Sequence, residues 1–448
     1  MTLEATYPIA SRTLDNGLRV VVSPTPGLGV VAVNIWYDVG SRHEQPTRQG
    51  FAHLFEHLMF QGSRHVAAGQ HFALVQGNGG SLNATTSFDR TNYFEVVPSG
   101  ALELALWLEA DRMAFLDDVL TQENFDTQVS VVAAERSQRM DNVPYGTAFE
   151  KLLPLIFDAE HPYGHLPIGN MAQLGEATLE EVSDFHSRFY MPGNAVLTLV
   201  GDVSEADAFA LADAHFGDIA AGEVPKRELP DPLPPISTSV RRDVTEDVPA
   251  PAVWFGARLP ADEVGSRELA AVEIAVGILG EGETSRLHRR LVREDEIALS
   301  AGFGINTLIA GNSLGAASVR AVPGVDLDTV AGVVRDVVLR LVDDGPSELE
   351  LSIARAQSER SWLDEMSTAG GRADALSACA LLYDDPRALN ERLPRLLSVT
   401  AEEVQAAAER WLVSALDTEL RVVPSGRAES PEHGSPAARR GPAGEVAE

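Results

Sequence analysis

The feature that most restricts the fold is a pair of histidines spaced for one face of a helix. Residues 53–57 read His-Leu-Phe-Glu-His within the apolar run 50–60. In a helix, His53 and His57 project from one face about one turn apart, within reach of a single ion. Glu56 lies beside them. This H-x-x-E-H order is the inverted form of a zinc-binding helix motif. The pattern therefore predicts a metal-binding helix and zinc-dependent hydrolysis.

Length and charge restrict the number of domains and the class of partner. A chain of 448 residues with 44% apolar residues favours about two to four domains of about 100–200 residues each. The net charge of −31 argues against nucleic acid, because phosphates would be repelled, and favours neutral or basic partners such as cationic peptides. The alternative explanation of this charge is solubility alone.

The single cysteine and the N-terminal residues bear on the compartment. Cys379 excludes an internal disulfide and a C-x-x-C metal site, and we expect it to be a small core residue. Residues 1–8 lack a basic start followed by an apolar stretch, and no segment offers about 18 uninterrupted apolar residues. We therefore expect no secretory signal, no membrane span and a cytoplasmic, reducing compartment.

The first part of the chain reads as a sheet interrupted by helices. β-Branched residues dominate 18–22 and 30–37, and the prolines and glycines between them predict two strands joined as a hairpin. The histidine helix follows. The other elements expected here are a turn at 77–80, strands at 84–87, 93–97 and 196–200, and helices at 102–115 and 125–139.

A proline-rich segment, residues 225–240, separates two stretches with the same order of elements. It divides the chain into an N-terminal zinc-binding half (1–224) and a C-terminal half (241–424), and residues 425–448 are expected to be disordered. In the second stretch we expect strands at 252–258, 300–309 and 314–322, a helix at 268–279, a Glu-Glu-Val helix at 402–404 and a closing strand at 419–423. We interpret this as an internal duplication in which the plain apolar helix 268–279 replaces the metal-binding helix. The predicted fold class is α+β, with two α/β halves that each cover a sheet with helices.

Two histidines do not complete a catalytic zinc site, which normally has three protein ligands and a water. Glu135 is the best third candidate, because it interrupts the apolar helix stretch 131–134 and a lone carboxylate there requires a cation. Glu109 and Asp111 are weaker alternatives, since Leu-Glu-Ala-Asp-Arg is also typical of a solvated helix edge.

Several longer segments resemble the M16 metallopeptidases, the pitrilysin and insulinase family that includes the mitochondrial processing peptidases. The resemblance covers about residues 10–425 and is more specific in the first half. It is carried by Asn16-Gly17-Leu18-Arg19-Val20, Gly40-Ser41-Arg42, the 53–60 segment, Gly79–Ser87, Leu108–Met113, Glu135-Arg136, Asn142–Gly146 and Pro162-Tyr163-Gly164-His165.

The resemblance implies a fold of the M16/LuxS-like metallohydrolase type and a role for each site residue. His53, His57 and Glu135 would hold one Zn²⁺ per chain, and Glu56 would be the general base that activates the zinc-bound water for attack on a peptide carbonyl. The strand at 83–87 would pair through its edge with an extended peptide, so that Asn83, Ala84 and Thr85 bind substrate.

Further positions either keep or change the family pattern. Gln128 stands where the family often has a second glutamate that supports the ligand, and Tyr163 belongs to a segment that also supports the site. In the second half Arg293 is kept as a substrate-binding arginine, but the tyrosine expected seven residues later is Ser300.

These expectations define the predicted function. The chain is predicted to be a zinc-dependent endopeptidase that hydrolyses short or unfolded peptides in a chamber between M16 halves. Closing the chamber requires a second chain, so we expect a heterodimer with a related chain that lacks H-x-x-E-H, or a homodimer. The alternative is a non-catalytic structural or peptide-binding subunit, which the intact motif disfavours. A third possibility is maturation of one peptide precursor.

Overall fold

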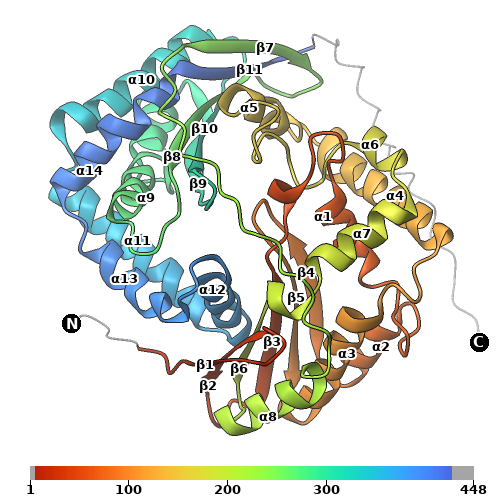
Figure 1. Cartoon of the computed structure of the whole chain (residues 1–448). Coiled ribbons are helices and arrows are strands. Elements are labelled where there is room, and N and C mark those ends of the chain that lie inside the picture. The colour runs from red at the N-terminus through yellow and green to blue at the C-terminus, as the bar shows by residue number, and fades with distance from the viewer. Residues whose placement is uncertain (1–5, 426–448) are drawn as a thin grey trace, which may run out of the picture.

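The strands form two separate sheets in the computed structural model, which describes residues 6–425 (Figure 1). The first sheet has six strands and the second has five. The order across the first sheet is β1 (Ala10–Thr13), β2 (Arg19–Pro24), β6 (Ala195–Gly201), β3 (Val30–Tyr37), β5 (Thr91–Pro98) and β4 (Ser81–Thr86). The order across the second is β7 (Val240–Glu246), β11 (Thr418–Pro424), β8 (Ala252–Pro260), β10 (Asn312–Ala321) and β9 (Ala298–Asn306).

The two sheets have the same topology, which confirms the predicted duplication. In each, the last strand of the half pairs in parallel with an early strand, as β6 does with β2 and β11 with β7. The other neighbours are antiparallel in both sheets. The first sheet adds only the edge strand β1. The predicted α+β fold, with two duplicated halves of sheet and helices, is confirmed.

The predicted hairpin between residues 18–22 and 30–37 is wrong. Both strands exist, as β2 and β3, but β6 lies between them and pairs with each. Residues 25–29 therefore cross over the end of β6 instead of forming a tight turn, and Asp202 accepts hydrogen bonds from the Gly27 and Gly29 amides. The strand that separates the two comes from about 160 residues later, which a local pattern does not reveal.

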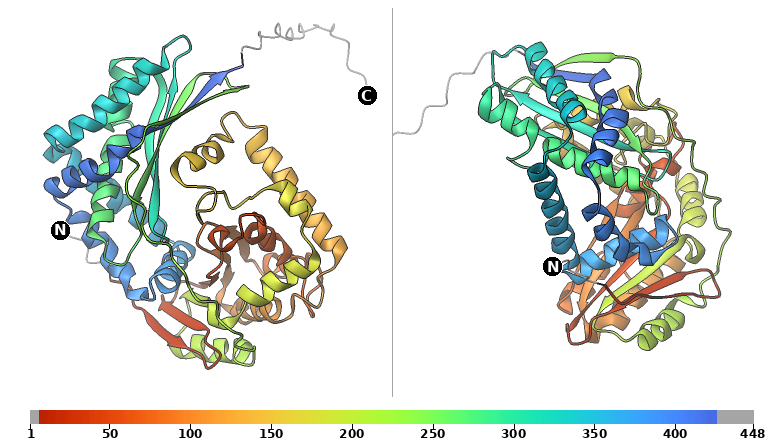
Figure 2. Two further views of the ribbon diagram at one scale, coloured as in Figure 1. Left: turned by 45° about the horizontal axis from the view of Figure 1, so that its top comes forward. Right: turned by 90° about the vertical axis from the view of Figure 1, so that its left-hand side faces the viewer.

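The helices lie mainly on the outer sides of the two sheets (Figures 1 and 2). Those of the first half are α1 (Phe51–Leu58), α2 (Gln70–Gly77), α3 (Leu102–Phe115), α4 (Gln122–Arg136), α5 (Ala148–Ile156), α6 (Met171–Gly175), α7 (Leu179–Phe189) and α8 (Glu205–Phe216). Those of the second are α9 (Arg267–Gly280), α10 (Leu327–Asp344), α11 (Glu348–Met366), α12 (Ala369–Leu382), α13 (Leu389–Leu397) and α14 (Ala401–Ala407). The equivalent helices α7 and α14 both begin with a Thr-x-x-Glu capping box, Thr178–Glu181 and Thr400–Glu403.

Each half covers the other half's sheet with one helix. All seven residues of β6 are buried, because alternate side chains enter two different cores. Leu197 and Leu199 face the first half's own helices, whereas Val196 and Val200 face α12 from the second half. In return, α5 of the first half packs on β8 and β11. The halves are thus held together by shared apolar cores, and the linker between them carries no helix or strand over residues 220–238.

Two further expectations, on a membrane span and on the C-terminal tail, are compared with the described residues. No helix within residues 6–425 is long and apolar enough to cross a membrane. The predicted disordered tail lies, except for Ser425, outside the described residues. The boundaries of the two domains stay a prediction.

Removing the α12 contact with the first sheet should destabilise the whole chain. Leu376 is fully buried in the core that α12 shares with β6, so Leu376→Ala should lower the free energy of unfolding by about 2–5 kcal/mol. The exposed Leu349 (70% exposed) is the matched control, and Leu349→Ala should change it by less than about 0.5 kcal/mol. Denaturant titration of both variants measures the difference. Equal effects would contradict a shared core.

Candidate metal centre

Helix α1 places the two histidines on the polar side of an otherwise apolar helix. The opposite face is fixed against the core, so the helical period leaves His53, Glu56 and His57 partly exposed. The two imidazole centroids are 4.9 Å apart, with the ring planes at 83°. The predicted helix is therefore present, with both histidines on one face. The buried residues of the opposite face are Phe51, Ala52, Leu54, Phe55 and Leu58.

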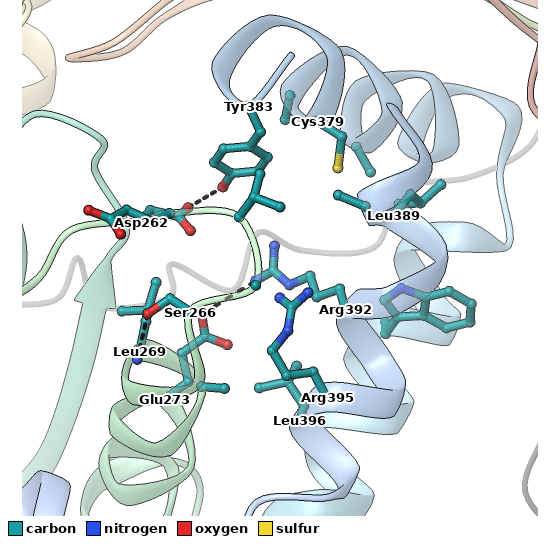
Figure 3. Close-up of a pocket in the computed structure, with 18 of the residues that line it drawn as sticks. Asp262, Ser266, Leu269, Glu273, Cys379, Tyr383, Leu389, Arg392, Arg395 and Leu396 are labelled. Carbon is teal, nitrogen blue, oxygen red and sulfur yellow. Dashed lines mark hydrogen bonds and ion pairs between the residues drawn. The ribbon is translucent and has the colours of Figure 1, made fainter. Parts of the chain in front are cut away.

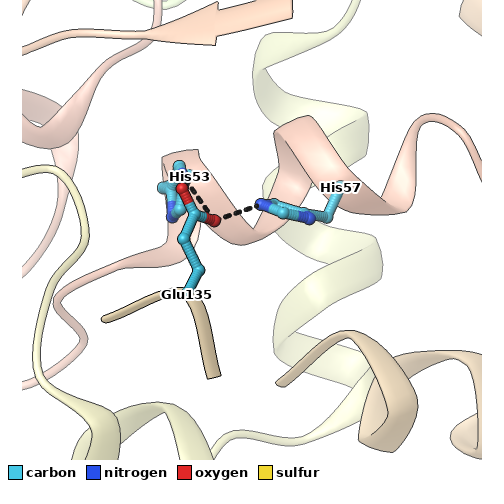
Figure 4. A group of neighbouring side chains, drawn as sticks. All are labelled: His53, His57 and Glu135. Atoms are coloured by element: carbon cyan, nitrogen blue, oxygen red, sulfur yellow. Dashed lines mark ion pairs between the residues drawn. The ribbon is translucent and has the colours of Figure 1, made fainter. Parts of the chain in front are cut away.

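Helix α4 brings a carboxylate to the same point (Figure 4). Glu135 Oε2 lies 3.6 Å from His53 Nε2 and 3.2 Å from His57 Nε2. Two ligand atoms of a tetrahedral zinc, each about 2.0–2.1 Å from the ion, are about 3.3–3.4 Å apart. Two imidazole nitrogens with one carboxylate oxygen are also a donor set that catalytic zinc sites use. The structure thus brings the three predicted ligands together with a spacing that fits zinc.

The two alternative carboxylates have other partners. Glu109 is fully buried and forms an ion pair with Arg112 on its own helix. Asp111 accepts a hydrogen bond from Ser63 and lies 2.5 Å from His65 Nδ1. Neither is placed with the histidines of α1, so the geometry favours Glu135 as the third ligand.

Burial keeps both histidine rings neutral. It lowers the pKa of His53 to about 4, and repulsion from His57 adds to this effect. Burial also lowers the pKa of His57, against the attraction of Glu135. The second oxygen of Glu135, Oε1, lies 2.6 Å from Arg139 Nη1, which supports its negative charge. Neutral imidazoles and an ionised carboxylate are the forms that bind a metal.

Glu56 is held by the neighbouring strand. Thr86, the last residue of β4, donates a hydrogen bond of 2.6 Å from Oγ1 to Glu56 Oε2. Burial raises the pKa of Glu56, although the Thr86 hydrogen bond opposes the shift. A carboxylate with a raised pKa is a better proton acceptor at neutral pH. The H-x-x-E-H motif indicates Glu56 but not the role of Thr86, because the spacing of a motif carries no information on a side chain from another element.

A second glutamate fixes the start of α1 and was also missed. The Glu44 side chain is fully buried and accepts hydrogen bonds from the Gly50 amide (2.7 Å) and the Ala52 amide (2.8 Å). His165 Nε2 lies 2.8 Å from Glu44 Oε2. These contacts satisfy amides that the first turn of a helix leaves free. Glu44 reaches six and eight residues ahead, beyond the spacing of a capping box, so no local pattern indicates its role.

The predicted peptide-binding strand lies at a free sheet edge. β4 is the last strand of its sheet and pairs only with β5 among the described strands. Asn83 and Thr85 are exposed, whereas the Ala84 side chain is buried. The Asn83 side chain accepts a hydrogen bond from the Ala84 amide. The edge is therefore open to an added strand, as the predicted role requires.

The remaining predicted residues lie further from the metal centre. Arg293 belongs to a π-helix, residues 288–294 of the second half, where it forms an ion pair with Glu283. Ser300, on β9, accepts a hydrogen bond from Arg320. Gln128 is buried on α4, two turns before Glu135. Tyr163 is buried and donates a hydrogen bond to Asp89. The structure thus joins Gln128 to the helix of the third ligand but does not bring Arg293 to it.

A second group of possible ligands is a core network. His71, Glu95 and Glu109 are all buried, and His71 Nε2 lies 2.5 Å from Glu95 Oε1. Burial raises the pKa of Glu95 to about 7. Arg112 already neutralises Glu109, which removes the need for a cation. We interpret this group as a hydrogen-bonded part of the core.

A cavity of about 120 Å³ lies in the second half between α9, α12 and α13 (Figure 3). Tyr383 donates a hydrogen bond to Asp262 on its wall, and Arg392 lies 3.7 Å from Glu273. Cys379 also lines it and is 8% exposed, which agrees with the predicted core position. No predicted site residue lines this cavity, so it is separate from the metal centre.

Comparison with known proteins gives the family. The profile described as Insulinase (Peptidase family M16) matches residues 19–161, and the Peptidase M16 inactive domain matches residues 176–358. "Uncharacterized zinc protease Rv2782c" of Mycobacterium tuberculosis is 30% identical over 404 residues, which are 89% of this chain and 90% of that protein. The chain belongs to peptidase family M16. The predicted family membership is confirmed.

Other M16 relatives agree in sequence and fold. "Zinc protease PqqE" of Helicobacter pylori is 28% identical over 419 residues, 92% of each chain. The crystal structure of "a protease from Helicobacter pylori" has a TM-score of 0.84 at 27% identity and covers 94% of this chain and 99% of that one. These relatives are named zinc proteases or proteases, and the match to the inactive-domain profile covers most of the second half.

Loss of Glu44 should weaken zinc binding by loosening the start of α1. Glu44→Ala leaves the Gly50 and Ala52 amides without their acceptor, so we expect zinc affinity to fall about 10–100-fold. Asp326 caps α10 in the second half, and Asp326→Ala is the matched control that should lose only helix stability of about 1 kcal/mol. Competition with a chelator of known zinc affinity measures both variants. Equal zinc affinities in the two would contradict this role of Glu44.

Proposed function

We propose that this chain is a zinc-dependent endopeptidase that hydrolyses short or unfolded peptides, with Glu56 as the general base. One observation carries the proposal: His53, His57 and Glu135 converge with ligand-like spacing, and Glu56 lies on the same helix face. The names of the M16 relatives as zinc proteases support it.

The residues of the site have two proposed roles, metal binding and proton transfer. His53, His57 and Glu135 would hold the zinc ion, which when bound lowers the pKa of a coordinated water toward neutrality. Glu56 would accept the proton from that water, and its raised pKa favours this acceptance near pH 7. Thr86 keeps the Glu56 carboxylate oriented through its hydrogen bond. Glu56 would then return the proton to the leaving amine.

The edge of β4 would hold the peptide. An extended peptide added to this edge bonds through its backbone, which gives affinity with little demand on sequence. Asn83, Ala84 and Thr85 would contribute to this binding. The net charge of −31 favours neutral and basic peptides in the chamber. We place this activity in the cytoplasm.

A second chain would complete the chamber. The structural match to pitrilysin has a TM-score of 0.73 and covers 94% of this chain but 45% of the pitrilysin chain. The pitrilysin chain is therefore about twice as long. Two chains of the present length would supply an equal amount of structure. Because Ser300 replaces the expected tyrosine, we propose a heterodimer with a related chain that lacks H-x-x-E-H, with a homodimer as the other arrangement.

The alternative function is a non-catalytic structural or peptide-binding subunit. The inactive-domain match to the second half is compatible with it. The first half argues against it, because the three ligands and the base are all present and placed together. We therefore favour the peptidase.

Replacing the base should separate zinc binding from hydrolysis. Glu56→Gln keeps the size and the hydrogen bond from Thr86 but removes the proton acceptor, so we expect zinc content near one per chain and a loss of activity of about 10²–10⁴-fold. The measurements are elemental analysis and cleavage of an unstructured basic peptide, with and without chelator. Glu103→Gln, an exposed change on α3 (74% exposed side chain), is the control and should behave like the wild type. Activity that survives Glu56→Gln would exclude Glu56 as the base.

The oligomeric state should decide the activity of the purified chain. We expect the chain alone to bind zinc but to cleave the basic peptide slowly, and activity to rise when a related chain without H-x-x-E-H is added. Light scattering coupled to size exclusion measures the species, and the peptide assay measures each fraction. Full activity in a monomeric fraction would contradict the need for a second chain.

A further inference from the structure

The tip of the β4–β5 hairpin is buried, although hairpin tips usually lie at the surface. Phe88 is 4% exposed and Asp89 is 3% exposed. Phe88 enters an apolar core that also contains Leu308 and Ala310, which belong to the second half. The hairpin that carries the proposed peptide-binding edge is therefore inserted between the two halves.

The carboxylate of Asp89 has a full set of partners at this tip. Its Oδ1 accepts a hydrogen bond from the Tyr163 hydroxyl (2.6 Å) and lies 3.0 Å from Arg42 Nε. Its Oδ2 accepts one from the Ile309 amide at 3.2 Å. Burial raises the pKa of Asp89, and the neighbouring Arg42 opposes that shift. Asp89 thus connects the first half to a backbone amide of the second.

Tyr163 makes the second connection to the same loop. Its hydroxyl accepts a hydrogen bond of 2.7 Å from the Ala310 amide while it donates to Asp89. Residues 307–311 join β9 to β10, so they are the duplicate of the turn 87–90 that joins β4 to β5. The two equivalent hairpin turns therefore meet, and Asp89 and Tyr163 take up two consecutive amides of the partner turn.

That partner turn is itself firmly held. The Leu308 amide donates to Ser313 Oγ at 3.0 Å. The Asn312 side chain bonds to the backbone of Leu233 in the linker in both directions. A loop that is fixed in this way offers a rigid reference for the turn that it contacts.

The other end of the catalytic hairpin contacts the base. Thr86 pairs with Thr91 across the strands and directly precedes the turn 87–90, so the residue that bonds to Glu56 stands three positions before Asp89. The Ser87 amide closes that turn on the Arg90 carbonyl at 2.8 Å. A shift of Asp89 would be carried to Thr86 through this short segment, and an error of about 1 Å in a catalytic group can cost about 10²-fold in rate.

We infer that Asp89 and Tyr163 are positioning residues, through which the second half sets the orientation of Glu56. They fix the turn 87–90 on the turn 307–311, and the turn fixes Thr86 on Glu56. The inference rests on the proposed role of Glu56 as the base. By this inference the second half contributes to the reaction indirectly, by orienting Glu56, and does not contact the reacting atoms.

The test compares two tyrosines that bridge the halves. Asp89→Ala would leave the buried Arg42 guanidinium without one of its two carboxylate partners, Asp38 and Asp89, so Tyr163→Phe is the milder variant. Tyr145 is the matched control, because its hydroxyl donates to the Ala250 carbonyl (2.7 Å) and accepts from the Ala250 amide (3.1 Å) of the second half. Both of these hydrogen bonds go to Ala250 and neither goes to the turn 87–90. Both variants lose one hydroxyl that links the halves, and only one of these touches the turn 87–90.

Kinetics should separate the two variants. For Tyr163→Phe we expect kcat on the basic peptide to fall about 10–100-fold, with KM within about twofold and zinc content unchanged. Tyr145→Phe should keep kcat within about twofold while its denaturation midpoint falls as much as that of Tyr163→Phe. Thr86→Val should reproduce the loss in kcat, and Thr86→Ser, which keeps the hydroxyl, should restore it. Unchanged kcat in Tyr163→Phe would overturn the inference.

Hydrogen exchange tests the connection without using activity. In Tyr163→Phe the amides of 85–91 and 309–310 should exchange at least about tenfold faster than in Tyr145→Phe. If they do not, the connection is absent and the inference fails, whatever the kinetics show. If the wild type neither binds zinc nor cleaves, the proposed function fails instead, and exchange still decides whether the two turns hold each other.

Discussion

The packing of α1 against α4 is the contact on which the metal centre depends. Two of the proposed ligands come from α1 and the third from α4, and both helices contribute buried apolar side chains, such as Leu54 and Val132, to the same core. The apolar faces fix the rotation of each helix, and the polar residues then point to one place. Burial adds the chemistry, because it lowers the pKa values of His53 and His57 and raises that of Glu56. The site is thus a consequence of core packing.

The duplication shows how one topology serves two roles. In the first half the helix that follows the third strand of the sheet is α1, which keeps one face polar. Its counterpart α9 has 10 of its 14 residues buried, so almost no side chain is free for chemistry. The sheet order is the same in both halves. One difference between the two halves therefore lies in the pattern of this helix.

The sequence predicted those features that local patterns encode. The helical period predicted α3 with its bounds, Leu102–Phe115, and it predicted that His53, Glu56 and His57 share one face of a helix. Prediction from the sequence failed where segments far apart in the chain contact each other. The hairpin of β2 with β3 was wrong because β6 enters between them, and Thr86 and Glu44 were missed because each acts on another element. The packing of α12 on the first sheet and of α5 on the second was missed for a similar reason. Amphipathicity indicates that a helix has a buried face but does not indicate which sheet covers it.

The contact between the two hairpin turns follows from the same duplication. The equivalent turns of the two halves contact each other, and each turn contributes a different kind of group to the contact. The first turn supplies side chains, Phe88 and Asp89, whereas the second supplies backbone amides, at Ile309 and Ala310. Backbone donors place no demand on side-chain identity, so these two contacts require no metal-binding side chain in the second half. A half without its own metal site can therefore remain necessary for the orientation of the base in its neighbour.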